Sequence, residues 1–149
     1  METGIKQRLV ETCRKKLTDS GLNLQQAMDD LQQQANDYGA PKDRYDPFKT
    51  QLLRRRDMLA QQLAKELQEL RILDKIDVGI ASPDVRFGAI VITSEFNYFI
   101  AVGLGKVDTT DGTFYAISLQ VPLYEALKGK KTGDKVAFRG KIIDIKQII

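Results

Sequence analysis

The sequence predicts an α+β fold in which a helical hairpin is followed by a small β-sheet domain. Apolar side chains recur every three or four positions through most of residues 5–73, which is the period of an amphipathic helix. Gly39, Pro41 and Pro47 interrupt that pattern at a single place. After residue 84 the pattern changes to short β-branched and aromatic runs separated by turn residues, which is typical of strands.

Residues 5–36 are expected to form the first helix. Its apolar stripe consists of Leu9, Cys13, Leu17, Leu24, Met28, Leu31 and Ala35. Ser20 and Gly21 fall inside this pattern and predict a bend or a loosened turn, because glycine costs about 1 kcal/mol relative to alanine in a helix interior. Gly39 is well placed to cap the C-terminus of the helix, with Pro41 just beyond it.

A second helix is expected to begin at Asp46 and Pro47, since Asp is a good N-cap and Pro is favoured at the first helical position. It runs to about Leu73, and its stripe consists of Phe48, Leu52, Leu59, Leu63, Leu67 and Leu70. Two such helices joined by a short loop can bury both stripes as an antiparallel coiled coil. We therefore expect a coiled-coil hairpin over residues 1–77, with residues 38–47 as its tip segment.

A C-terminal domain is expected over residues 84–149, because Ser82 and Pro83 end the helical period. One short helix is expected from Pro122 to Lys128, closed by Gly129. Five strands are predicted, at residues 87–93, 98–103, 113–118, 135–138 and 142–148. Short strands joined by turns predict an antiparallel sheet packed against the helix.

The composition excludes several classes of function. The 149 residues include no histidine, which removes Ser-His and Cys-His nucleophiles and histidine metal sites. The single cysteine, Cys13, cannot form an internal disulfide, and the N-terminus has no apolar run of signal type, so we expect a cytoplasmic protein. No stretch approaches about 18 apolar residues, so no membrane span is expected. The net charge of +3 is too small to indicate nucleic-acid binding by itself.

The most specific signal lies in the C-terminal domain. Its skeleton is Ala116-Ile117-Ser118, Pro122-Leu123, Ala126-Leu127, Gly129-Lys130-Lys131, Gly133-Asp134 and Val136, with Phe87-Gly88-Ala89 before the first strand. This pattern resembles the C-terminal domain of the bacterial Gre-type transcription elongation factors (the GreA/GreB family). The resemblance is strong over residues 87–148 and weak over residues 1–77, where the order of a helical hairpin before this domain is similar to the family's.

The resemblance implies an FKBP-like C-terminal domain and a factor of transcription elongation that binds RNA polymerase, with DNA binding as an accompanying expectation. In this family the coiled coil enters the polymerase's secondary channel, near the nascent RNA 3′ end. Acids at the tip then help the polymerase to hold a Mg²⁺ ion that activates water to cut backtracked RNA. The resemblance assigns that part to Asp43 and Asp46. We expect no metal, other cofactor or active site belonging to the chain itself.

The tip departs from the family's pattern. The usual motif is Gly-Asp-Leu-Lys-Glu-Asn, whereas the stretch from Gly39 to Arg44 is Gly-Ala-Pro-Lys-Asp-Arg. The first acid is thus replaced by Ala40 and the second is shortened to Asp43. Asp46 can supply another carboxylate in a different register, or it can simply cap the second helix. Transcript cleavage and a non-cleaving, inhibitory binder of the secondary channel therefore both remain open.

Two further surfaces are candidates for contacts with a partner. The resemblance places Gln120, Val121 and Pro122 in the segment that docks on the rim of the polymerase, and a simple helix entry is the alternative. Arg54, Arg55 and Arg56 form a basic run, of which at most two side chains can serve one patch on a helix. We expect a monomer, and a coiled-coil adaptor with no polymerase role is the alternative from another class.

Overall fold

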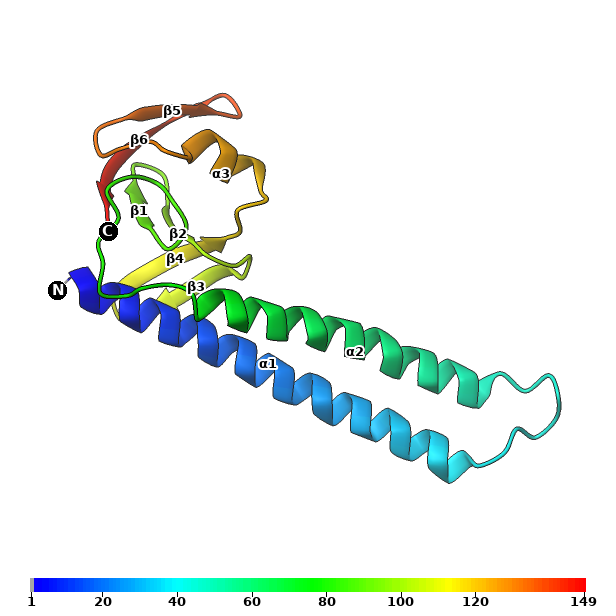
Figure 1. The fold of residues 1–149 in the computed structure, drawn as a ribbon. Coiled ribbons are helices and arrows are strands. Elements are labelled where there is room, and N and C mark those ends of the chain that lie inside the picture. The colour runs from blue at the N-terminus through cyan, green and yellow to red at the C-terminus, as the bar shows by residue number, and fades with distance from the viewer. Residues whose placement is uncertain (1) are drawn as a thin grey trace. The chain divides into compact units, whose positions relative to one another are not determined.

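The computed structural model describes residues 2–149 and has the predicted α+β class. Two long helices packed against each other are followed by a six-stranded, mostly antiparallel sheet with one short helix (Figure 1). The chain divides into two compact units, which are described separately. The hairpin unit is Lys15–Leu70, and the sheet unit combines the residues up to Arg14 with Arg71–Ile149.

The first helix, α1, spans Glu2–Tyr38 without interruption, so the loosened turn predicted at Ser20 and Gly21 is absent. The physical reason lies in the partner helix α2, Phe48–Leu73. Ser20 Oγ donates a hydrogen bond of 2.6 Å to Glu66 Oε1, and a methyl group at Gly21 would lie 3.5 Å from Leu63 Cδ1. Contacts between the helices therefore hold this part of α1 in helical conformation despite its low intrinsic propensity.

The apolar stripes predicted from the sequence largely face the helix–helix interface. In the hairpin unit, Leu17, Ala35 and Leu52 are buried, and Leu24, Leu59 and Leu63 are half-buried. Phe48 and Leu67 depart from the prediction, because they are 45% and 46% exposed. A pair of helices has only one shared seam to fill, so half-burial of stripe residues is the expected outcome.

The sheet unit contains one strand more than predicted and one pairing of different direction. The strands are β1 Ile90–Thr93, β2 Asn97–Ile100, β3 Gly105–Thr109, β4 Gly112–Ile117, β5 Lys135–Phe138 and β6 Lys141–Ile148, in the spatial order β3-β4-β2-β1-β6-β5. Strand β3 escaped prediction because Val107 is its only buried residue. It forms an antiparallel hairpin with β4. Strand β4 pairs on its other side with β2, in parallel, with Tyr98 opposite Tyr115. The expectation of a purely antiparallel sheet is thus wrong for this pair.

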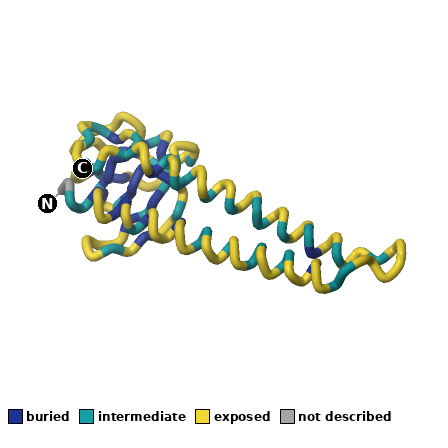
Figure 2. The backbone as a smooth tube through the Cα atoms, turned by 60° about the horizontal axis from the view of Figure 1, so that its bottom comes forward, coloured by how far each residue is buried: buried dark blue, intermediate teal, exposed yellow. Residues whose placement is uncertain are grey.

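The short helix α3, Pro122–Leu127, covers one face of the sheet as predicted. Its buried Tyr124 and Leu127 belong to a core that also contains Val91, Ile100 and Ile145. Figure 2 shows buried backbone positions concentrated in the strands of this unit. Side chains of the strands and of α3 therefore form one hydrophobic core in this unit.

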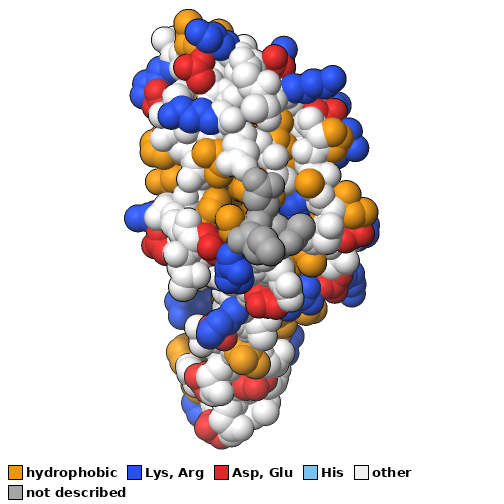
Figure 3. All heavy atoms as spheres, turned by 90° about the vertical axis from the view of Figure 1, so that its left-hand side faces the viewer, with side chains coloured by type: hydrophobic (Ala, Val, Ile, Leu, Met, Phe, Trp, Pro, Cys, Tyr) orange, Lys and Arg blue, Asp and Glu red, His pale blue; other side chains and the backbone are white. Residues whose placement is uncertain are grey.

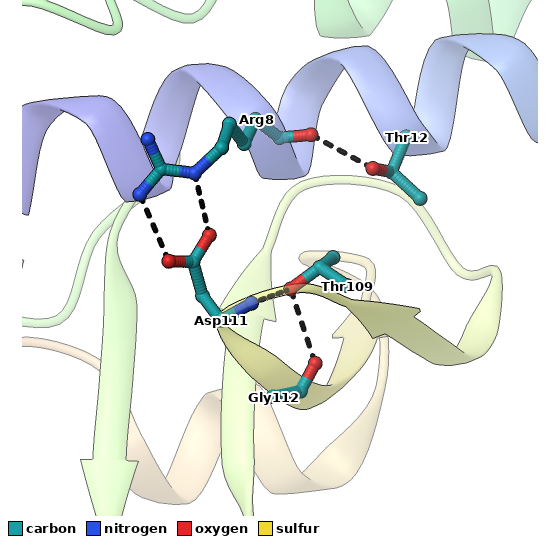
Figure 4. A network of polar contacts seen from close by, with 5 residues as sticks. All are labelled: Arg8, Thr12, Thr109, Asp111 and Gly112. Carbon is teal, nitrogen blue, oxygen red and sulfur yellow. Dashed lines mark hydrogen bonds and ion pairs between the residues drawn. The ribbon is translucent and has the colours of Figure 1, made fainter.

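The first turns of α1 are attached to the sheet unit by polar contacts. Arg8 Nε and Nη2 donate hydrogen bonds to the two carboxylate oxygens of Asp111, at 2.7 and 2.8 Å, in the turn between β3 and β4 (Figure 4). Thr109 Oγ1 accepts from the Asp111 amide at 3.1 Å and supports that turn. The paired geometry is the one that guanidinium and carboxylate groups form best.

Lys6 makes a second attachment within the sheet unit. Lys6 is only 2% exposed, and its Nζ donates to the Ile80 carbonyl at 2.9 Å and to Ser82 Oγ at 3.4 Å. Burial lowers the pKa of Lys6, and the nearby charge of Asp77 opposes part of that shift. Lys6 therefore ties the start of α1 to the segment that follows α2.

The surface carries both signs of charge. On the face drawn in Figure 3, lysine, arginine, aspartate and glutamate side chains lie interspersed, with smaller hydrophobic areas between them. No helix among the described residues combines the length and apolar character needed to cross a membrane.

Replacing Gly21 with alanine is expected to stabilise the hairpin unit by about 1 kcal/mol, because the helix has room for the added methyl group. Gly39→Ala is the matched control. Gly39 has a φ of +77°, which disfavours any side chain, so this substitution is expected to destabilise the protein. Urea denaturation followed by circular dichroism at the helical band measures both effects. Equal losses of stability in the two variants would contradict the prediction.

Candidate functional site

The tip segment, residues 38–47, connects the two helices of the hairpin unit. Gly39 ends α1 in the left-handed conformation, and its amide donates to the Ala35 carbonyl at 3.3 Å. No helix or strand follows until Phe48. Most side chains from Ala40 to Tyr45 are exposed, so their conformation depends on hydrogen bonds made within the segment.

Asp46 ties the tip segment together. Its Oδ1 accepts a hydrogen bond of 3.0 Å from the Phe48 amide, which is the N-cap role that the sequence predicted. Its Oδ2 accepts from the Lys42 amide at 2.9 Å and from the Tyr38 hydroxyl. One carboxylate therefore connects the end of α1, the middle of the loop and the start of α2.

Titration of Tyr38 and Asp46 is coupled by this contact. The hydrogen bond to the Asp46 carboxylate raises the pKa of Tyr38 to about 12. The Tyr38 hydroxyl and the amides of Lys42 and Phe48 lower the pKa of Asp46. The Tyr38 contribution to stability is therefore complete below its ordinary pKa near 10 and is lost as the pH rises through about 12. The Asp46 contribution is present above its ordinary pKa near 4 and is lost as the pH falls through its lower folded value.

The Asp43 carboxylate accepts fewer hydrogen bonds within the tip segment than that of Asp46. Its Oδ1 accepts from the Tyr45 amide at 2.8 Å, which forms a local turn of the kind common for aspartate. Its backbone carbonyl accepts from the Asp46 amide at 3.2 Å. The turn uses one carboxylate oxygen, so Oδ2 of this exposed side chain lies outside it. Asp43 consequently keeps one carboxylate oxygen outside the hydrogen bonds of the turn, whereas both oxygens of Asp46 accept hydrogen bonds.

Cations and aromatic rings alternate along the tip segment. Lys42 Nζ lies 4.8 Å from the centroid of the Tyr38 ring, and the Arg44 guanidinium carbon lies 4.9 Å from that of Tyr45. The Phe48 ring packs on Tyr38 with centroids 4.7 Å apart. The apolar periodicity of the sequence does not predict these contacts. The signal that could have predicted them is the pair of aromatic residues at the end of α1 and the start of α2, Tyr38 and Phe48.

Among residues 2–149, no group of three or more His, Cys, Asp or Glu side chains is arranged to hold a metal ion. Asp43 and Asp46 are linked through the backbone of the tip segment, and the contacts of Asp46 occupy both of its oxygens. Oδ2 accepts two of these hydrogen bonds, so a magnesium ion at this oxygen would have to compete with both donors.

The basic run on α2 is divided between two roles. Arg56 donates to Gln32 of α1 and, at 2.8 Å through Nη2, to its neighbour Asp57, so it serves the hairpin itself. Arg54 and Arg55 are exposed and remain candidates for contact with a partner. This division follows from the helix period, which spreads three consecutive side chains over most of a turn.

The predicted docking residues lie at the start of α3 in the sheet unit. Val121 occupies the N-cap position, Pro122 follows at the first helical position, and no side chain caps the helix. Gln120 and Pro122 are exposed, whereas Val121 is half-buried against the core. Both the helix entry and a contact surface are compatible with this arrangement, so the docking role stays a prediction.

The Tyr38 contact predicts an unusual titration in the tip segment. The Tyr38 ring is expected to titrate at about 12 in the native chain and at a lower pH, nearer 10, in Asp46→Asn, because that substitution removes the negative charge beside the hydroxyl. Carbon-13 NMR of labelled tyrosine rings measures the titration, with Tyr38→Phe assigning the resonance. An unchanged Tyr38 titration in Asp46→Asn would contradict the proposed contact.

Asp46→Ala is expected to loosen the whole tip segment, whereas Asp43→Ala is expected to act locally. The first variant removes the acceptor of the Lys42 and Phe48 amides, and the second removes that of the Tyr45 amide. Loss of a charged acceptor should speed solvent exchange of the affected amides by about tenfold. Exchange measured by NMR tests this pattern, and equal effects of the two variants on Lys42 would contradict it.

Comparison with known proteins gives no independent assignment. No family model, curated protein or solved structure matches the chain. A function therefore has to be inferred from the residues of the tip segment and from the sequence pattern of the sheet unit.

Proposed function

We propose that the chain is a Gre-like transcription elongation factor that binds RNA polymerase and inserts its tip segment into the secondary channel. The observation that carries this proposal is the defined tip at the end of a long helical hairpin. The Asp46 carboxylate fixes that tip by accepting hydrogen bonds from Tyr38, Lys42 and Phe48, although the backbone of the tip segment forms neither helix nor strand. A loop held in one conformation loses less entropy when it enters a partner, which supports this role.

The sheet unit supports the same proposal through its sequence pattern and its elements. The short helix that begins at Pro122 follows β4, and the Gly129–Val136 stretch leads into β5, in the order that the resemblance implies. We propose that this unit has the FKBP-like arrangement and that Gln120, Val121 and Pro122 contact the rim of the polymerase. Two exposed residues beside a half-buried valine offer both polar and apolar contact area.

In the cleavage reaction, Asp43 is the residue proposed to contribute a ligand to the Mg²⁺ ion of the polymerase. Carboxylate oxygens suit this ion, and Oδ2 of Asp43 lies outside the turn that Oδ1 makes. When bound, the metal supplies an activated water for phosphodiester cleavage. Asp46 is proposed as a positioning residue, because its amide donates to the Asp43 carbonyl and its carboxylate fixes the surrounding loop.

A second candidate function is a non-cleaving binder that occupies the channel and inhibits transcription. The specific observation in its favour is that the contacts within the tip segment occupy both oxygens of Asp46. Ala40 stands at the position of another expected acid, and Arg44 places a positive charge beside Asp43. These features leave one carboxylate available where the family's mechanism is expected to use two.

The decisive experiment adds the chain to stalled, backtracked RNA polymerase complexes and measures both retention and release of short 3′ RNA fragments. Under the leading proposal, the chain is retained and fragments appear. Asp43→Asn should then reduce the cleavage rate by about 10- to 100-fold without loss of retention. Asp30→Asn is the matched control, because it changes an exposed acid on α1 outside the tip segment and should leave cleavage unchanged.

Three other results of this experiment would each lead to a different conclusion. Retention without cleavage would support the second candidate. Cleavage that persists in Asp43→Asn would contradict the role of that residue. Failure to bind the polymerase would remove both candidates and favour an adaptor that acts elsewhere.

A further inference from the structure

Tyr45 is the most exposed large hydrophobic side chain among the described residues, at 78%. A single exposed apolar residue is ordinary, so the exposure alone indicates little. Tyr45 differs in that the Arg44 guanidinium lies over its ring, with the carbon 4.9 Å from the centroid. The guanidinium occupies one face, and the exposed fraction leaves the other face open to solvent.

The backbone that carries this ring is held in place. The Tyr45 amide donates to Asp43 Oδ1 at 2.8 Å, and the adjacent Asp46 is tied to Lys42 and Phe48. An aromatic side chain on a fixed backbone loses little conformational entropy when a ligand stacks on it. The tip segment therefore presents the exposed Tyr45 ring from a backbone that hydrogen bonds hold in place.

Positive charge near Tyr45 comes mainly from α2. Within the tip segment Lys42 and Arg44 are offset by Asp43 and Asp46, whereas the beginning of α2, residues 48–56, carries one lysine and three arginines but no acid. Arg54 and Arg55 of this stretch are exposed. Aromatic faces combined with nearby cations meet the two requirements of single-stranded nucleic acid, which are stacking of the bases and neutralisation of the phosphates.

We propose that Tyr45 and Arg44 form a stacking site for an unpaired base of single-stranded RNA, with Lys42 and the exposed arginines of α2 contacting its phosphates. A base in a duplex already has both faces stacked, so the site is specific for unpaired bases. The biological setting of this inference rests on the proposed function, because an RNA 3′ end is a ligand of this kind. The binding chemistry itself requires no polymerase.

The test is an NMR titration of the full chain with hexa-adenylate RNA at low salt, following the ring signals of Tyr45. Stacking is expected to move these signals upfield to a saturating value. Tyr45→Ala should weaken binding by about tenfold or more, while Tyr45→Phe should retain it, because every base has a face on which an aromatic ring can stack. Phe96→Leu is the control, because it changes an exposed aromatic residue of the sheet unit, and it should leave binding unchanged.

Two competitor oligomers separate stacking from attraction of charge. An abasic ribose-phosphate hexamer has the same phosphates without bases, and a blunt-ended RNA duplex without loops or overhangs has bases that are already paired. Both should bind at least about tenfold more weakly than hexa-adenylate. Equal binding of either oligomer, unchanged binding by Tyr45→Ala, or no saturable shift of the Tyr45 ring would overturn the inference.

Retention of the same variants on RNA polymerase distinguishes this inference from the proposed function. Absence of RNA stacking in the native chain, together with normal retention, would overturn the stacking site alone. Normal stacking without retention would leave the RNA site in place and overturn the polymerase role.

Discussion

The carboxylate of Asp46 is the interaction on which the end of the hairpin depends. It joins three segments that are separate along the chain, namely the last turn of α1 through Tyr38, the loop through Lys42 and the first turn of α2 through Phe48. Without it, the segment between Gly39 and Pro47 would rely on a few backbone contacts and on the turn at Asp43. The conformation of Asp43, Arg44 and Tyr45 therefore follows from a residue that itself faces inward to the loop.

This arrangement separates two uses of acidic side chains that the sequence alone cannot distinguish. An aspartate before a proline at a helix start can cap the helix, bind a cation or do both. The hydrogen bonds that lower the pKa of Asp46 also keep its carboxylate ionised and occupied. Asp43 takes no part in the capping of α2 and uses one oxygen for its own turn, so its other oxygen lies outside that turn.

The helices were predictable because periodic burial and capping residues are local properties. Leu9, Leu17 and Leu52 are buried as their spacing predicted, and Gly39 ends α1 in the conformation that glycine favours. Strand β3 and the parallel pairing of β2 with β4 were missed because pairing direction depends on residues distant in sequence, and only Val107 of β3 is buried. The same limit applies to the site, since the bond from Tyr38 to Asp46 crosses the loop and leaves no periodic signal.

The charges at the end of α1, next to the tip segment, are not the ones that best stabilise a helix. A helix favours cations in its last turn, yet α1 has no base there and contains Asp37. Residues 22–38 contain three aspartates and no charged residue of the other sign, and each aspartate accepts a hydrogen bond from a neutral glutamine, as in the 2.8 Å bond from Gln33 to Asp37. An unfavourable charge at a helix end costs about 0.3–1 kcal/mol. Neutral donors satisfy the oxygens while leaving the negative charge in place, so α1 is acidic where the start of α2 is basic. Charge therefore differs in sign between the facing ends of the two helices, and charge complementarity would affect the two helices in opposite directions.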